Sequence, residues 1–77
     1  MKYNELGDLR EAAHRAARLL RVGGYKHVVY AYTLKTDPTT IHVADWNPLC
    51  FPTDEAFAQW YNRNHNDIDF AYAVHRF

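Results

Sequence analysis

The sequence predicts an α+β domain in which two helices pack on one face of a three-stranded antiparallel sheet. Three observations support this class: an apolar stripe at helical spacing, an unbroken β-branched and aromatic run after it, and a second helix start between two further strand patterns. The predicted element order is α-β-β-α-β. The chain has 77 residues, nearly half of them hydrophobic, and we expect one domain over residues 1–77.

The first helix is predicted over Glu5–Arg21. Its apolar residues recur at steps of three and four and form one stripe: Leu6, Leu9, Ala13, Ala16, Ala17 and Leu20. Asn4 can cap the start, and the glycines at 23 and 24 are typical of a helix end. Gly7 weakens the first turn by about 1 kcal/mol relative to alanine, so the helix could begin at Asp8 instead.

The strongest strand signal is Lys26–Lys35, which is rich in β-branched and aromatic residues and contains neither glycine nor proline. We expect it to be the central strand. A turn is predicted at residues 36–39, which include Asp-Pro, and a return strand at Thr40–Trp46. A four-residue turn would place Tyr32 opposite Val43, so that the large apolar residues of both strands share a face.

The second helix is predicted to begin after Thr53, its N-cap, and to end before Asn62. A connection over residues 47–52, with two prolines, precedes it. The third strand is predicted over Ile68–Phe77. A right-handed crossover through the second helix would place this last strand beside the first, giving the strand order 2-1-3 with antiparallel neighbours.

Both helices are expected on the face that carries Tyr30, Tyr32, Val43, Phe70 and Tyr72. The opposite face would then be open, and its partly apolar character predicts a surface for a protein partner or a second copy. The residues predicted to contact the partner are His27, Val29, Thr33, His42, Trp46 and His75. The alternative is that a helix covers this face and makes it a second core.

Catalytic and metal-binding patterns are weak. His27, His42 and His75 come from three different strands and share no local ligand motif, so we expect solvated imidazoles and no metal. Cys50 has apolar neighbours and no adjacent base, which predicts a buried structural thiol. Asp54 is interpreted as a helix-start residue, and no glycine-rich phosphate loop is present. We therefore expect no enzymatic activity and no cofactor.

The charge of the chain is unevenly distributed, which points to an alternative site. Residues 1–35 contain seven Lys or Arg and three Asp or Glu, whereas residues 36–77 contain two and six. The arginines of the first helix could bind a nucleic-acid backbone or an acidic protein groove; they are Arg10, Arg15, Arg18 and Arg21. Glu11 interrupts them, and a solvated helix face with a Glu11–Arg15 pair is the simpler interpretation. The sequence matches no nucleic-acid-binding module.

The single cysteine cannot form an internal disulfide, and no signal peptide or membrane span is recognised, so we expect a cytoplasmic monomer or homodimer. The hairpin ending at Asp45-Trp46, the helix start Thr53-Asp54-Glu55-Ala56 and the final strand with Tyr72 are similar in outline to small α+β anti-CRISPR proteins. This resemblance implies a phage protein that sterically blocks a host nuclease complex or another host enzyme, without a cofactor. Two further possibilities are a nucleic-acid-binding regulator and a structural homo-oligomer.

Overall fold

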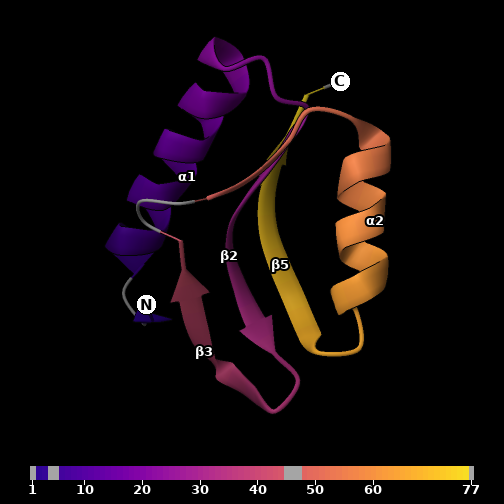
Figure 1. Cartoon of the computed structure of the whole chain (residues 1–77). Helices are drawn as coiled ribbons and strands as arrows, with labels where there is room; N and C mark the ends of the chain where they lie inside the picture. The colour runs from indigo at the N-terminus through magenta and orange to yellow at the C-terminus, as the bar shows by residue number, and fades with distance from the viewer. Residues whose placement is uncertain (1, 4–5, 45–47, 77) are drawn as a thin grey trace.

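The computed structural model describes residues 2–3, 6–44 and 48–76. The elements are β1 (Lys2–Tyr3), α1 (Leu6–Val22), β2 (His27–Leu34), β3 (Asp37–Val43), β4 (Leu49–Phe51), α2 (Asp54–Asn64) and β5 (Ile68–His75). The five strands belong to one sheet in which each paired strand is antiparallel to its neighbour (Figure 1). The predicted α+β class is confirmed.

The central strand is β2, as its composition predicted. β5 pairs with one side of β2 from His27 to Leu34. On the other side, β4 pairs with the first part of β2 and β3 with the second, and β1 pairs with the outer side of β3. The return, first and last strands thus have the predicted order 2-1-3. The sequence did not predict the short strands β1 and β4.

The turn between β2 and β3 is shorter than predicted. Leu34 lies opposite Asp37, so residues 35–36 form the turn and the return strand begins earlier than expected. The pairing of β2 with β3 then shifts between Leu34 and Tyr32, so Tyr32 lies opposite His42, one residue away from its predicted partner. Because side chains alternate along a strand, a one-residue change in register places a different set of residues on each face.

The end of α1 follows the sequence signals. The helix ends at Val22, and the N–H of Gly23 donates to the carbonyl of Leu19 at 2.8 Å. Gly24 has φ 73°, in the left-handed region that glycine adopts without steric strain. The glycine pair therefore ends the helix and directs the chain into β2.

The start of α2 is also as predicted. Thr53 is the N-cap, and its hydroxyl accepts a hydrogen bond from the N–H of Ala56 at 3.1 Å. The helix continues to Asn64, beyond the predicted end before Asn62. The side-chain amide of Asn64 donates to the carbonyl of Trp60 at 2.7 Å, so the polar stretch extends the helix rather than ending it.

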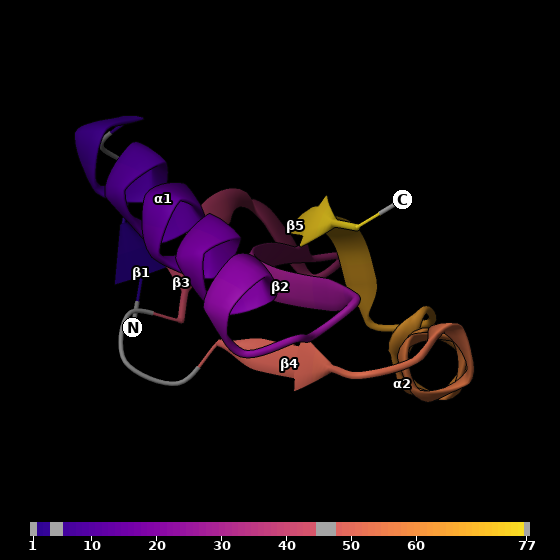
Figure 2. The same cartoon turned by 90° about the horizontal axis from the view of Figure 1, so that it is seen from above.

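The two helices lie on opposite faces of the sheet (Figure 2). Ala12 of α1 forms the main core with Ala31 and Val43. Phe57 of α2 instead stacks on His27, with ring centroids 4.5 Å apart. The predicted placement of both helices on one face therefore does not hold, and the second face carries its own apolar cluster under α2.

A β-bulge in β2 explains how one strand contributes to both clusters. Its pairing with β5 shifts between Val29 and Ala31, so Tyr30 is an extra residue in β2. Simple alternation would place His27 and Ala31 on the same face. Because of the extra residue, His27 faces α2 while Ala31 faces α1.

Candidate protein-binding site

A chain of polar side chains joins β2, β5 and the start of α2. Nε2 of His27 lies 2.6 Å from Oδ1 of Asp54, and Nζ of Lys26 donates to Oδ2 of the same carboxylate at 2.9 Å. On the other side of the ring, Nδ1 of His27 lies 2.7 Å from Nδ1 of His75. His27 is at the centre of this chain, stacked on Phe57 and with only 12% of its side chain exposed.

Strand pairing and helix capping bring these groups together. His27 lies opposite both His75 of β5 and Phe51 of β4, and directly opposite residues project from the same face of a sheet. The Thr53 cap fixes the start of α2 immediately after β4, which places Asp54 beside His27. No local motif connects Asp54 with His27, so the sequence pattern predicted only a helix-start role for Asp54.

The protonation of the chain follows from its geometry. An ionised Asp54 only accepts hydrogen bonds, so Nε2 of His27 carries the hydrogen that points to it. Only one of the two Nδ1 atoms carries a hydrogen on the side that faces the other ring, because two hydrogens there would repel each other. Two hydrogen bonds lower the pKa of Asp54 below its usual value. The bond from Lys26 has the larger effect, and the bond from His27 has the next largest.

This polar chain links three elements of the fold, β2, α2 and β5. Among the described residues, no hydroxyl or thiol is hydrogen-bonded to His27 or His75. Within the same ranges, no three His, Cys, Asp or Glu side chains are grouped so that they could hold a metal ion. What the arrangement does is attach the start of α2 to β2 and to the end of β5.

A groove lies beside the polar chain, between α2 and β5. Its volume is about 250 Å³, and its lining includes Phe57, Tyr61, Ile68, Phe70, Ala71 and Ala73, with Asp69 toward one end of β5 and His75 at the other. Tyr61 is 49% exposed and Phe70 is 55% exposed. Exposed aromatic side chains next to a groove are typical of protein-binding surfaces.

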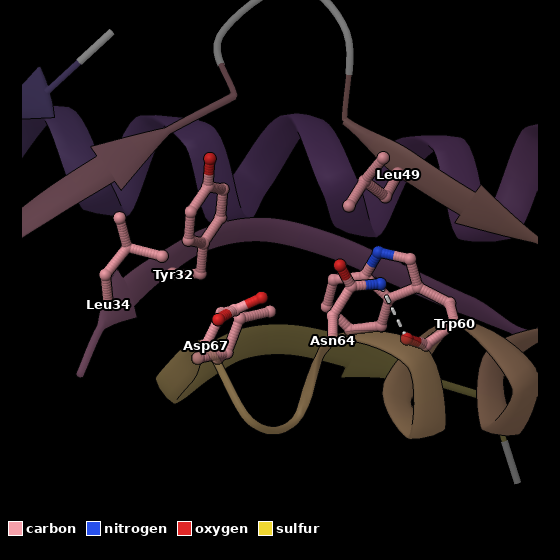
Figure 3. Close-up of a pocket in the computed structure, with 7 residues that line it drawn as sticks. Tyr32, Leu34, Leu49, Trp60, Asn64 and Asp67 are labelled. Atoms are coloured by element: carbon pink, nitrogen blue, oxygen red, sulfur yellow. Dashed lines mark hydrogen bonds between the residues drawn. The ribbon is translucent and has the colours of Figure 1, made fainter. Parts of the chain in front are cut away.

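A second groove, of about 270 Å³, opens near the end of α2 (Figure 3). Trp60 and Asn64 of α2 face Tyr32 and Leu34 of β2 across it. Leu49, Asp67 and Ile68 complete its lining. This groove shows that α2 covers its face of the sheet only in part.

Of the six residues predicted for an open sheet face, the strand register places His27, Val29, His42 and His75 on one face and Thr33 on the other. His27 and His75 meet in the polar chain, whereas Val29 and Thr33 are buried. His42 is half-buried and stacks on Tyr32, with ring centroids 5.2 Å apart. Trp46 lies outside the described residues. The face that carries four of these residues is therefore not open, because α2 covers part of it, and the β-bulge places Thr33 on the other face.

The alternative site on α1 is at the surface. Arg10, Arg18 and Arg21 are exposed, while Arg15 is half-buried and makes a side-chain interaction. Because α1 and α2 lie on opposite faces, these arginines and the groove beside β5 belong to different sides of the molecule (Figure 2). A partner could occupy either side without contacting the other.

Cys50 is a half-buried thiol on β4. Its Sγ lies 3.6 Å from the carbonyl oxygen of Pro48, to which the thiol donates, and burial raises its pKa above the usual value. A thiol of raised pKa is a poor nucleophile at neutral pH. Cys50 therefore does not add a reactive group to the grooves.

The comparisons with known proteins identified no relative of this chain. A scan against protein-family models found no match, and searches of the curated proteins and of the solved structures found none either. Within the described residues, no helix combines the length and the apolar character needed to cross a membrane. The interpretation of the site rests on its own geometry.

Proposed function

We propose that this chain is a small, non-enzymatic protein-binding module that accepts an extended segment of a partner protein along the outer edge of β5. The observation that carries the proposal is the outer side of this eight-residue strand, with which no described residue pairs, beside a groove with exposed aromatic side chains. Backbone hydrogen bonds along such an edge supply affinity, and pockets for alternate side chains supply specificity.

Two features favour a protein over a small molecule as the ligand. The groove beside β5, at about 250 Å³, is below the range of about 300–1,000 Å³ that is usual for small-molecule pockets. Tyr61 and Phe70, which are about half exposed, present flat apolar surface next to polar backbone. This combination suits an extended peptide whose side chains alternate between the groove and solvent.

The resemblance to anti-CRISPR proteins suggests the purpose of such binding. A module of this size could sterically block a host enzyme or nucleoprotein complex by occupying one of its surfaces. This action needs no cofactor and no catalytic group on the module. In this proposal the protein acts in the cytoplasm, which is the host cytoplasm if a phage encodes it.

A pull-down from bacterial lysate with edge variants tests the proposal. Ala71→Pro removes an outward-facing N–H from β5, whereas Ala71→Ser keeps it. We expect the partner to be captured by the wild type and by Ala71→Ser but lost with Ala71→Pro, while all three show the same circular dichroism. Capture that is equal for all three variants would contradict the proposal.

A second candidate function is nucleic-acid binding through α1, which the exposure of Arg10, Arg18 and Arg21 favours. Arginine contacts to phosphates release counterions, so such binding weakens steeply with salt. A salt titration of DNA and RNA binding with Arg18→Glu, and with Arg63→Glu on α2 as a matched control, separates the two functions. Loss of binding only with Arg18→Glu would support the second candidate, and no measurable binding at low salt would eliminate it.

A further inference from the structure

Some backbone N–H groups of β5 point away from β2 and are available for hydrogen bonds with another strand. The N–H of Arg76 donates to the carbonyl of Lys26 at 2.9 Å, so the backbone of Arg76 points toward β2. Backbone groups alternate in direction along a strand. The N–H groups of Ala71, Ala73 and His75 therefore point outward, and within the described residues no other segment pairs with this side of β5.

The centre of this edge lacks the features that usually protect edge strands. Between Phe70 and Val74 there is neither a charged residue nor a proline, although both are common where an edge must not pair with another chain. The other side of the sheet differs, because β3 contains Pro38 and pairs with β1. β5 therefore offers an edge that can pair with another strand.

The charges of β5 are complementary to those of a second, antiparallel β5. Asp69 is near the start of the strand, and His75 and Arg76 are at its end. In the register that places Ala71 opposite Ala73 of the partner subunit, Asp69, which is an extra residue in the pairing of β5 with β2, comes close to His75 of the partner subunit. The same register places the exposed Phe70 opposite Val74 of the partner subunit. An antiparallel copy therefore lets Asp69 accept a hydrogen bond from His75 of the partner subunit and covers the exposed ring of Phe70.

We propose that a second copy of this chain occupies the outer edge of β5, so that two sheets join into one continuous sheet across a two-fold axis. The proposal rests on the proposed function, because it uses the same edge. The homodimer is the resting form, and it shields an edge that would otherwise pair with unrelated chains. A partner protein then has to displace the second copy to reach β5.

Sedimentation and amide hydrogen exchange of the full chain test this arrangement. We expect the mass to approach twice 9.1 kDa as concentration rises. The amides of Ala71, Ala73 and His75 should become protected over the same concentration range. The inward-facing amides of Tyr72 and Val74 are the internal control, because β2 protects them at every concentration. A monomer at millimolar concentration, or a dimer without protection at Ala71 and Ala73, would overturn the proposal.

Two pairs of variants locate the interface. Ala71→Pro should give a monomer, whereas Ala71→Ser should remain dimeric. Asp69→Lys replaces a carboxylate acceptor with a positive group near Arg76 of the partner subunit and should weaken the dimer at least tenfold, whereas Glu55→Lys, the same charge change on α2, should not. A dimer that persists in both edge variants overturns the proposal. If Ala71→Pro does not fold, the hydrogen-exchange data on the wild type show whether β5 forms the interface.

This test and the lysate experiment can fail independently. A wild-type monomer whose partner is still lost with Ala71→Pro would eliminate the homodimer and leave the protein-binding function supported. A dimer through β5 combined with partner capture that is insensitive to Ala71→Pro would support the homodimer and contradict the proposed site of partner binding.

Discussion

Nδ1 of His27 lies 2.7 Å from Nδ1 of His75, which joins the first residue of the central strand to the last residue of β5. The other ring nitrogen of His27 contacts Asp54 in the first turn of α2. One largely buried imidazole thus connects three elements that are distant in the sequence. Phe57 and His75, which both contact His27, also line the groove beside β5.

Replacing His27 with alanine should destabilise the protein. The substitution removes two hydrogen-bonded contacts and the stacking on Phe57, and we expect a loss of roughly 2–3 kcal/mol in the free energy of unfolding. Urea denaturation measures the effect. His14→Ala, at an exposed position on α1, is the control and should change stability by less than about 0.5 kcal/mol. Equal stabilities of the two variants would contradict the structural role of His27.

The stability of the protein should fall in acid through Asp54. Its pKa is lower in the folded state than in the unfolded chain, because Lys26 and His27 donate to the carboxylate. The charged form therefore stabilises the fold above the unfolded pKa, and this contribution is lost as the pH falls through the folded pKa. Asp54→Asn should reduce stability at neutral pH and flatten the acid limb of the pH profile.

Thermal denaturation at a series of pH values measures the Asp54 effect. Glu55→Gln is the control, since it removes a carboxylate from the same turn of α2. A pH profile that is as steep for Asp54→Asn as for the wild type would show that the ion pair does not couple folding to protons.

Substituting Thr33 with valine should stabilise the protein. Thr33 is 5% exposed, and its hydroxyl has no hydrogen-bond partner among the described residues. Valine has nearly the same shape and removes the buried polar group, so we expect a gain of about 1 kcal/mol. Thr40→Val is the matched control, because the hydroxyl of Thr40 donates to Asp37 at 2.6 Å and its loss should be unfavourable. Destabilisation by Thr33→Val would indicate a role for the hydroxyl.

Cys50 should react slowly with alkylating agents in the native protein. Burial raises the pKa of its thiol, so at a given pH less of the reactive thiolate is present in the folded state than in the unfolded chain. The rate of iodoacetamide modification, with and without denaturant, measures this difference. A cysteine at the exposed position 59 (Gln59→Cys in a Cys50→Ser background) should react equally fast in both states. Fast modification of native Cys50 would contradict its burial.

The candidate site was only partly predictable from sequence. His27 and His75 were identified, because strand alternation placed both on one face, and the structure brings them into contact. Asp54, Phe57 and Tyr61 were missed as site residues. They meet β2 and β5 only because β4 pairs beside His27 and directs α2 across that face. No spacing in the sequence encodes this long-range contact.

The sequence by itself determined the α+β class, the central position of β2, the strand order and the Thr53 cap, because these depend on local periodicity, composition and short-range hydrogen bonds. Only the tertiary structure decided the register of the hairpin and the separation of the helices. An irregularity in the pairing of β2 with β3 and one extra residue in β2, Tyr30, change which side chains share a face. Whether a bulge forms depends on how well both faces pack, and that free energy exists only in the assembled sheet.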